Sequence, residues 1–149
     1  MKIAMGSDHA GLELKEKLKS HLTGAGVEVD DFGTTGSESV DYPDFAFKAA
    51  GAVACGECDY GVLVCSTGVG MCVAANKVRG VRAALASDVD TAAQSRAHVD
   101  CNVLVLGQKL IDSGTAIAVL DRWLNTPFEG GRHGRRVGKI TDFENSQAG

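Results

Sequence analysis

The stretch Y-G-V-L-V-C-S-T-G-V-G, residues 60–70, gives the clearest indication of the fold class. Its first six residues, Tyr60–Cys65, form a continuous apolar run, which is typical of a strand buried on both faces of a parallel sheet. Two glycines and small polar residues follow, and a short helical pattern then extends to about Lys77. A buried strand, a tight turn and a helix in this order predict one unit of an α/β fold.

The same alternation continues on both sides of this unit. Short apolar runs predict strands over residues 2–5, 27–31, 60–65, 81–86 and 103–106. Apolar residues at helical spacing predict further helices over residues 12–22, 43–53, 88–98 and 115–124. Asp41 and Asp88 precede two of these helices, and we expect them to act as caps. Five strands that alternate with helices imply right-handed crossovers and a three-layer α/β/α, Rossmann-like fold around a parallel sheet.

The composition is that of an ordinary globular protein. The 149 residues are 44% apolar and 23% charged, and 15 basic against 19 acidic side chains give a net charge of −4. This length is typical of one domain, so we expect a single domain over residues 1–149. The apolar runs are far shorter than the ~20 residues of a membrane-spanning helix, and the mild acidity argues against a nucleic-acid partner.

The five cysteines indicate a reducing compartment. Their number is odd, and the first residues turn polar too early for a secretory signal, so we expect a cytoplasmic protein without disulfides. Cys55 and Cys58 form a C-x-x-C motif, but Cys55 ends a helical pattern that Gly56 stops. The helix dipole at that end disfavours a thiolate, and no second ligand pair completes a zinc site. We therefore expect neither redox nor metal chemistry there.

Polar residues gather where three of the predicted strands end. The first strand leads into Ser7-Asp8-His9, the third into Ser66–Gly70, and the fifth into Gly107-Gln108-Lys109. Ligands of open parallel sheets bind beyond the carboxyl ends of the strands. We therefore expect these three segments to converge on one crevice.

The segment Ser66–Gly70 suits an anion. Its glycines and small side chains let backbone N–H groups point outward at the start of a helix, where they can hold a phosphate or an oxyanion. The other interpretation is a tight turn alone. Cys65 comes directly before this segment, where a thiol ionises readily and can act as a nucleophile or a base. The alternative for Cys65 is a small buried apolar residue, which is our prediction for Cys72 and Cys101.

Three other polar segments have both a functional and a structural explanation. Asp8 and His9 fit a binding site, but either could cap the helix that follows. His98 falls at a predicted helix C-terminus, where histidines often serve as caps. The basic segment 132–136, RHGRR, fits a phosphate monoester through its guanidinium groups, or a solvated tail.

Taken together, these segments resemble the sugar-phosphate isomerases of the ribose-5-phosphate isomerase B type. The resemblance runs in order over nearly the whole chain, and it includes relatives that act on galactose 6-phosphate or allose 6-phosphate. The motifs that carry it are GSDHAG (6–11), DYPD (41–44), C-x-T-G-x-G (65–70), AANK (74–77) and EGGRH (129–133).

The resemblance implies an aldose–ketose isomerase that needs no cofactor and no metal. Such an enzyme interconverts D-ribose 5-phosphate and D-ribulose 5-phosphate by moving a proton between C1 and C2 through a cis-enediolate. Members of this family are homodimers, sometimes paired into tetramers, with the site at the subunit interface. By the same resemblance, the C-terminal helix packs on a partner subunit.

The resemblance also assigns roles to residues of this chain. Cys65 would be the base that takes and returns the carbon-bound proton, and His98, assisted by Asp8, would be the acid that opens the furanose ring. Thr67 would help to move protons between O1 and O2. The remaining substrate-binding residues would be His9, Ser66, Gly68, Val69, Gly70, Val99, Lys109, Arg132, His133 and Arg136.

Two positions depart from the family pattern. Val99 stands where the family commonly has asparagine after the catalytic histidine, and Lys109 stands where it usually presents an arginine. The aliphatic side chain cannot bond a sugar hydroxyl, whereas lysine keeps the charge and loses only the bidentate fork. Val99 therefore leaves open the same chemistry on another sugar phosphate, such as allose 6-phosphate, galactose 6-phosphate or a tetrose phosphate.

Two functions of other classes compete with this interpretation. Residues 68–73 read G-x-G-x-x-V, with Asp88 twenty residues after Gly68, as in a nicotinamide dehydrogenase, but the third glycine and a substrate domain are missing. A non-catalytic sensor of sugar phosphates could use the same glycine segment and arginines. Cys65 and His98 argue against a sensor, because a sensor needs neither a base nor an acid.

Overall fold

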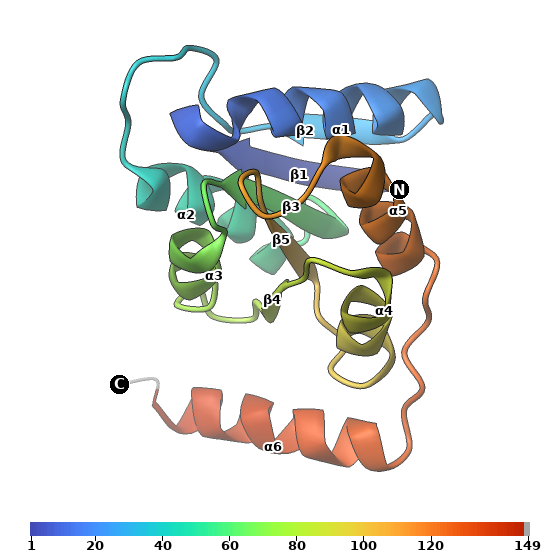
Figure 1. Ribbon diagram of the computed structural model, residues 1–149. Helices are drawn as coiled ribbons and strands as arrows, with labels where there is room; N and C mark the ends of the chain where they lie inside the picture. Colours follow the sequence, from blue (N-terminus) through green and yellow to red (C-terminus); the bar gives the residue numbers. More distant parts are fainter. Residues whose placement is uncertain (148–149) are drawn as a thin grey trace.

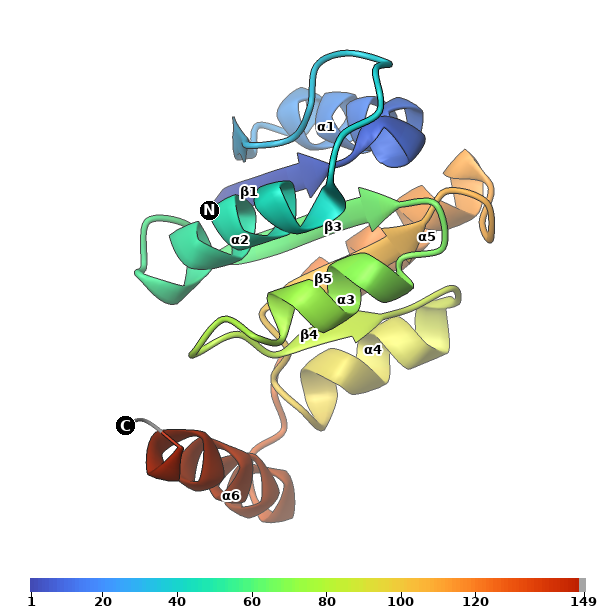
Figure 2. The ribbon, with the colours of Figure 1, turned by 90° about the vertical axis from the view of Figure 1, so that its left-hand side faces the viewer.

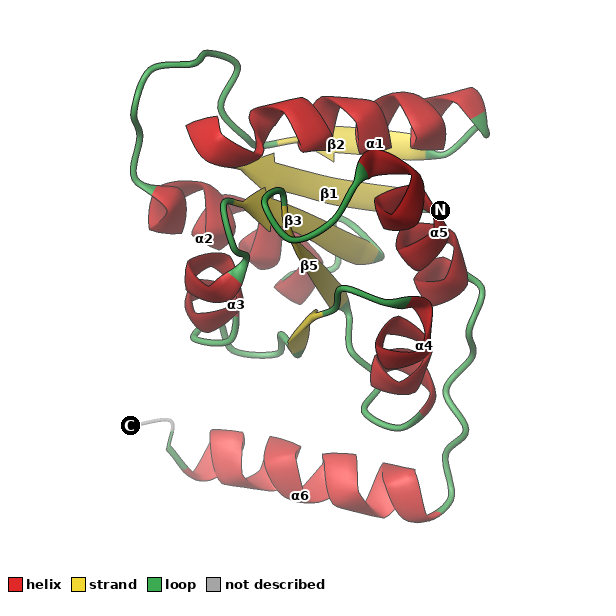
Figure 3. Ribbon diagram, viewed as in Figure 1, coloured by secondary structure: helices red, strands yellow, loops and turns green. Residues whose placement is uncertain are grey.

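The computed structural model describes residues 1–147, which form a three-layer α/β/α fold with a C-terminal helix (Figure 1, Figure 3). The sheet is five-stranded and parallel, in the order β2-β1-β3-β5-β4, which confirms the predicted fold class. The strands are β1 (Lys2–Ser7), β2 (Glu28–Asp31), β3 (Tyr60–Cys65), β4 (Ala83–Leu85) and β5 (Val103–Gly107). The helices are η1 (His9–Gly11), α1 (Leu12–Gly24), α2 (Tyr42–Ala54), α3 (Val69–Ala75), α4 (Val89–Ala97), α5 (Ser113–Leu124) and α6 (Arg132–Ser146).

The apolar side chains of the strands alternate between two cores. In β3, Val62 and Val64 pack in the core formed with α1, α4 and α5, whereas Leu63 and Cys65 pack in the core formed with α2 and α3. Both faces of the sheet are thus covered, which explains why β3 is a continuous apolar run. Figure 2 shows α2 and α3 in front of the sheet, with the strands pointing in one direction.

Several element boundaries differ from the predicted ones. Strand β4 is only three residues long instead of six, because Val81 N–H bonds back to Val78 O at 3.1 Å and Arg82 N–H bonds to the side chain of Asn102 at 2.8 Å. Asp88 caps α4 as predicted, with Oδ1 accepting from Thr91 N–H. Asp41 occupies the N-cap position of α2, but its side chain accepts no hydrogen bond from the first turn.

Helix α6 stands apart from the α/β body (Figure 1, Figure 2). None of its described residues is buried, and Ile140 and Phe143 leave 52% and 67% of their surfaces exposed. Its last turn is tied to the body, since the carboxylate of Glu144 accepts from Gly80 N–H at 3.2 Å and Arg79 Nη2 donates to Asn145 Oδ1 at 2.7 Å. Among residues 1–147, none of the helices combines the length and apolar character needed to cross a bilayer.

Candidate active site

The carboxyl ends of β1, β3 and β5 lie side by side, as the sequence predicted. Cys65, the last residue of β3, pairs with Gly107 of β5, and β1 pairs with β3 up to Ser7. The loop after β5 is bonded to the loop after β3, because Lys109 N–H donates to Ser66 O at 2.9 Å. Segments that are far apart in the sequence therefore meet at the carboxyl ends of these strands, here called the carboxyl edge.

Cys65 lies at the centre of this edge. Its side chain is buried, with 5% of the residue surface exposed, on the face of the sheet that α2 and α3 cover. Gly68 N–H donates to Cys65 Sγ at 3.2 Å. This contact places a backbone donor against the sulfur at the end of β3.

The glycines of the segment Ser66–Gly70 are required by close contacts. Gly68 has φ +83°, and a Cβ there would lie 2.5 Å from Leu85 Cδ1. A Cβ on Gly70 would lie 2.6 Å from the ring of Tyr42. These glycines form the tight turn that the sequence offered as the alternative to an anion site. The same turn directs the N–H of Gly68 at the thiol of Cys65. The structural and the anion-binding interpretations are therefore compatible.

Asp8 and His9 lie in the turn that begins η1, directly against β3. A Cβ on Gly11 would lie 2.4 Å from Val64 O, so only glycine allows this approach. Asp8 is buried and its Oδ1 accepts from Gly11 N–H at 3.0 Å, which is the capping role that the sequence left open. His9 Nδ1 accepts from Val40 N–H at 3.1 Å, so the neutral ring carries its hydrogen on Nε2, where it can donate to an anion.

The other predicted residues form a second cluster, around His98 at the C-terminal end of α4. The ring of His98 stacks on that of His133, with centroids 4.1 Å apart and planes within 5° of parallel. Glu129 Oε2 lies 3.3 Å from His98 Nε2 and 4.0 Å from His133 Nε2. Burial, and then the charges of His98 and Arg132, lower the pKa of His133 below its ordinary value.

Glu129 is a residue of this cluster that sequence reasoning did not single out. Its backbone N–H donates to Ala97 O at 3.0 Å, which holds the segment before α6 against the end of α4. Its place in the EGGRH motif, four residues before His133, was the available signal. The ligand atoms of His98, Glu129 and His133 lie within 4.8 Å of one another. Because the two rings are parallel, their in-plane lone pairs do not converge on one ion, so the set fits an ion pair better than a metal.

The predicted site residues thus form two groups, which lie at opposite ends of the parallel strands. We call them the carboxyl-edge group and the amino-edge group. The carboxyl-edge group comprises Asp8, His9, Cys65, Ser66, Thr67, Gly68, Val69, Gly70 and Lys109. The amino-edge group comprises the predicted residues His98, Val99, Arg132, His133 and Arg136, together with Glu129. His98 precedes β5, whose five residues span about 13 Å before the chain reaches the carboxyl edge. In Figure 2 the strands point away from α6, so one chain does not bring the two groups together.

Cys101 is buried in the core and Cys72 is half-buried against it, which is the packing role predicted for both. Cys55 is the C-cap of α2, and Gly56, with φ +84°, ends the helix there. Burial, reinforced by Asp30, raises the pKa of Cys58 to about 11. Burial likewise raises the pKa of Cys101 to about 11, and Cys72 Sγ donates to Ala83 O at 3.6 Å. Thiolate chemistry is disfavoured at Cys58 and Cys101.

Comparisons with known proteins identify the family of this chain. The Ribose/Galactose Isomerase family profile matches residues 3–140. Ribose-5-phosphate isomerase B of Escherichia coli K12 is 48% identical over 143 residues, which cover 96% of each chain. The structure of the Clostridium thermocellum ribose-5-phosphate isomerase B has a TM-score of 0.98 at 49% identity, covering 99% of this chain and 100% of that one. The Mycoplasma genitalium enzyme with bound ribulose 5-phosphate has a TM-score of 0.95 at 43% identity, covering 98% and 97%. With matches over almost its full length, this chain belongs to the Ribose/Galactose Isomerase family.

Proposed function

We propose that this protein is an aldose–ketose isomerase that interconverts D-ribose 5-phosphate and D-ribulose 5-phosphate. The names of the E. coli and C. thermocellum relatives support this activity, and the M. genitalium structure with ribulose 5-phosphate supports the substrate. The observation in this chain that carries the proposal is the contact from Gly68 N–H to Cys65 Sγ, at 3.2 Å, where β3 ends.

Cys65 acts as the base of the reaction. The thiolate takes the proton from C2 of the open-chain aldose, the C–H electrons form the C1=C2 bond, and the negative charge passes to O1. Thr67 helps the hydroxyl proton of O2 to reach O1, and the Cys65 thiol then returns its proton to C1, leaving the ketone at C2. Because the charge develops on oxygen, backbone N–H groups of Ser66–Gly70 contribute most by stabilising the enediolate.

The amino-edge group of a second copy completes this site. His98 of that copy opens the furanose ring together with Asp8, and Arg132 and Arg136 hold the phosphate with His9, near His133. Guanidinium groups suit the phosphate because they bond it in a bidentate manner. The separation of the two groups in one chain, and the exposed apolar side chains of α6, support a homodimer or a pair of dimers. The free cysteines fit the reducing cytoplasm.

Another sugar phosphate is the alternative substrate, and Val99 favours it. The Val99 side chain is 37% exposed, so it is available to a ligand while offering no hydrogen bond. A site with an aliphatic group at this position loses a polar contact to the open-chain sugar. Allose 6-phosphate, galactose 6-phosphate and a tetrose phosphate are the candidates for the same proton transfer.

An isomerase assay tests this proposal. Wild type and Cys65→Ala are compared on ribose 5-phosphate, allose 6-phosphate, galactose 6-phosphate and erythrose 4-phosphate. We expect wild type to prefer ribose 5-phosphate, and Cys65→Ala to lose about 10²–10⁴-fold in kcat, the range for removal of a positioned acid or base. Turnover that is unchanged in Cys65→Ala, with an unchanged circular dichroism spectrum, would contradict the role of the thiol.

A further inference from the structure

The turn from α4 to β5, residues 98–102, has an unusual backbone. Asp100 has φ +51°, and it is the one non-glycine residue with positive φ among residues 1–147. Aspartate enters the left-handed region more readily than most residues, but the conformation is still disfavoured and needs support from its surroundings. His98 and Val99, two residues of the amino-edge group, lie in the same turn. The left-handed residue is thus part of the turn that carries these two residues.

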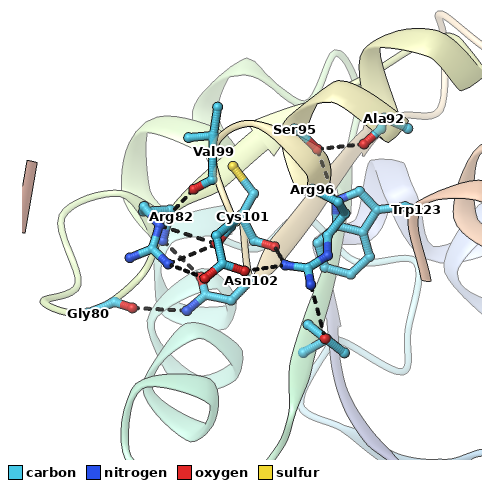
Figure 4. A network of polar contacts seen from close by, with 11 residues as sticks. Gly80, Arg82, Ala92, Ser95, Arg96, Val99, Cys101, Asn102 and Trp123 are labelled. Carbon is cyan, nitrogen blue, oxygen red and sulfur yellow. Dashed lines mark hydrogen bonds and ion pairs between the residues drawn. The ribbon is translucent and has the colours of Figure 1, made fainter. Parts of the chain in front are cut away.

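Arg82, the residue before β4, supports this turn. Its Nε donates to Val99 O at 3.0 Å, and its Nη2 donates to Asp100 O at 2.8 Å (Figure 4). Nη2 also lies 3.4 Å from Asp100 Oδ2. One planar guanidinium thus bridges two consecutive carbonyls and a carboxylate, and this restrains the peptide between Val99 and Asp100.

Arg96 holds Asp100 from the other side. Its Nη1 donates to Asp100 Oδ1 at 3.0 Å and to Cys101 O at 2.7 Å, and only 7% of the residue is exposed. The guanidinium lies 4.9 Å from the ring centre of Tyr60 and 5.6 Å from that of Trp123, so its own position is fixed by the core. Figure 4 shows Arg96 beside Trp123. The carboxylate of Asp100 is therefore bonded by a buried arginine on one oxygen and by Arg82 on the other.

We infer that Arg82, Asp100 and Arg96, here called the corner network, are positioning residues for isomerisation. They hold the turn so that His98 and the side chain at position 99 reach the site of a second copy. The inference rests on the proposed function. The corner network also takes part in substrate selection, because Arg82 bonds the backbone carbonyl of Val99. Position 99 is where the chain departs from its family pattern.

Kinetics of the full-length Arg82→Met variant provide the first test. We expect kcat/KM for ribose 5-phosphate to fall by about 100-fold, the effect of a displacement of roughly 1 Å in a catalytic group. The rate at which iodoacetamide alkylates Cys65 should stay within about twofold of wild type, because the carboxyl edge is untouched. Arg82→Lys should recover part of the loss, since it keeps one charged donor.

Two further variants make this test specific. Asp100→Asn keeps an acceptor for Arg96 and tolerates the left-handed region, so it should lose less activity than Arg82→Met and fold if that variant does not. Arg122→Met is the matched control, because its exposed side chain forms no ion pair with the residues that the structure describes. Equal losses of kcat/KM and of Cys65 reactivity in Arg82→Met and Asp100→Asn would indicate general destabilisation and overturn the inference.

Mixed assemblies decide whether the network acts on the other copy. Arg82→Met and Cys65→Ala chains are co-expressed with different tags, and the mixed species is purified through both tags. One of its two sites then combines Cys65 of the Arg82→Met chain with the corner network of the Cys65→Ala chain. About half of the wild-type activity should therefore return. If wild type is active and the mixed species is inactive, the inference about the corner network is overturned, whereas the isomerase activity is not. Wild type that turns over no sugar phosphate would overturn the proposed function, and the inference with it.

Discussion

Gly68 holds a backbone conformation that an L side chain rarely adopts, and its N–H is the donor to Cys65 Sγ. A Cβ there would lie 2.5 Å from Leu85 Cδ1. We expect Gly68→Ala to lower the free energy of unfolding by about 1–3 kcal/mol because of the left-handed backbone. Displacement of the N–H, which donates to the Cys65 sulfur, should also reduce kcat by about 10²-fold, an effect of the size found when one donor to a developing anion is removed.

Urea unfolding and kcat measurements check this prediction, with Gly51→Ala as the control. Gly51 lies inside α2 with no atom within 4 Å of an added Cβ, so its replacement should stabilise the helix by about 0.5–1 kcal/mol. Wild-type kcat in Gly68→Ala would show that the N–H of Gly68 has no part in the reaction.

Val99 offers a prediction about specificity. In Val99→Asn, the new amide at the site of the second copy should raise kcat/KM for ribose 5-phosphate by roughly tenfold, which is the effect of one added hydrogen bond. The preference for ribose 5-phosphate over hexose phosphates should change as well. Competition assays between pentose and hexose phosphates measure the change. Val99→Ala is the control that removes bulk without adding the amide. If all three proteins show the same preference, position 99 does not select the substrate.

The sequence predicted some residues of the site much better than others. Cys65 and Gly68 follow a buried strand, and strand ends of a parallel sheet converge whatever the details of packing. Arg82 and Glu129 were not singled out, because their partners Asp100 and His98 lie 18 and 31 positions away with no periodicity to indicate the contact. Polar contacts of this kind become visible only when the turns are placed in space.

At the scale of elements, apolar periodicity predicted each strand and the helices between them, but it did not predict where each element ends. The ends depend on local polar bonds. Strand β4 stops after Leu85 at an edge of the sheet where Asn76 takes the place of a neighbouring strand, with its Oδ1 accepting from Ala83 N–H at 2.8 Å. A side chain that satisfies an edge strand leaves no pattern in the apolar residues.

The contact between α1 and β2 has a pH dependence that can be measured. Burial raises the pKa of Asp31, but hydrogen bonds from Lys15, Gly33 and Lys19 outweigh it, so the pKa lies below the ordinary value of 3.8. The folded carboxylate therefore stabilises the protein above pH 3.8, and this contribution is lost as the pH falls through the lower, folded-state pKa. The loss should be smaller in Asp31→Asn, as measured by urea unfolding from pH 6 down to about pH 3.

Asp31→Asn should also destabilise the protein near neutral pH. Lys15 is fully buried, with Nζ 2.7 Å from Asp31 Oδ2 and 3.0 Å from Glu16 Oε1, so removing the closer of these two charges should cost about 1–3 kcal/mol. Glu13→Gln is the control, since the Glu13–Lys17 pair is exposed and worth only about 0.3–0.5 kcal/mol. Parallel acid unfolding curves for wild type and Asp31→Asn would mean that other carboxylates carry the pH dependence.

At the scale of the whole molecule, α6 carries apolar side chains that the described part of one chain leaves largely exposed. Ile140 and Phe143 are exposed on it, and a helix of this kind is expected to pack on another surface. Replacing both by aspartate should dissociate the proposed dimer in sedimentation experiments and abolish isomerase activity. Lys139→Gln, an exposed polar change on the same helix, is the control and should leave both unchanged. An assembly of unchanged mass in the double variant would exclude α6 from the interface.

The most direct test of a site shared between two chains inactivates the carboxyl-edge group in one chain and the amino-edge group in the other. Cys65→Ala disables the carboxyl-edge group, and His98→Ala disables the amino-edge group, so each variant alone should be nearly inactive. A doubly tagged assembly that contains one chain of each kind has one complete site if the groups meet across two copies. We predict that it regains about half of the wild-type turnover of ribose 5-phosphate. No recovery, from an assembly of native mass and fold, would contradict a site shared between two chains.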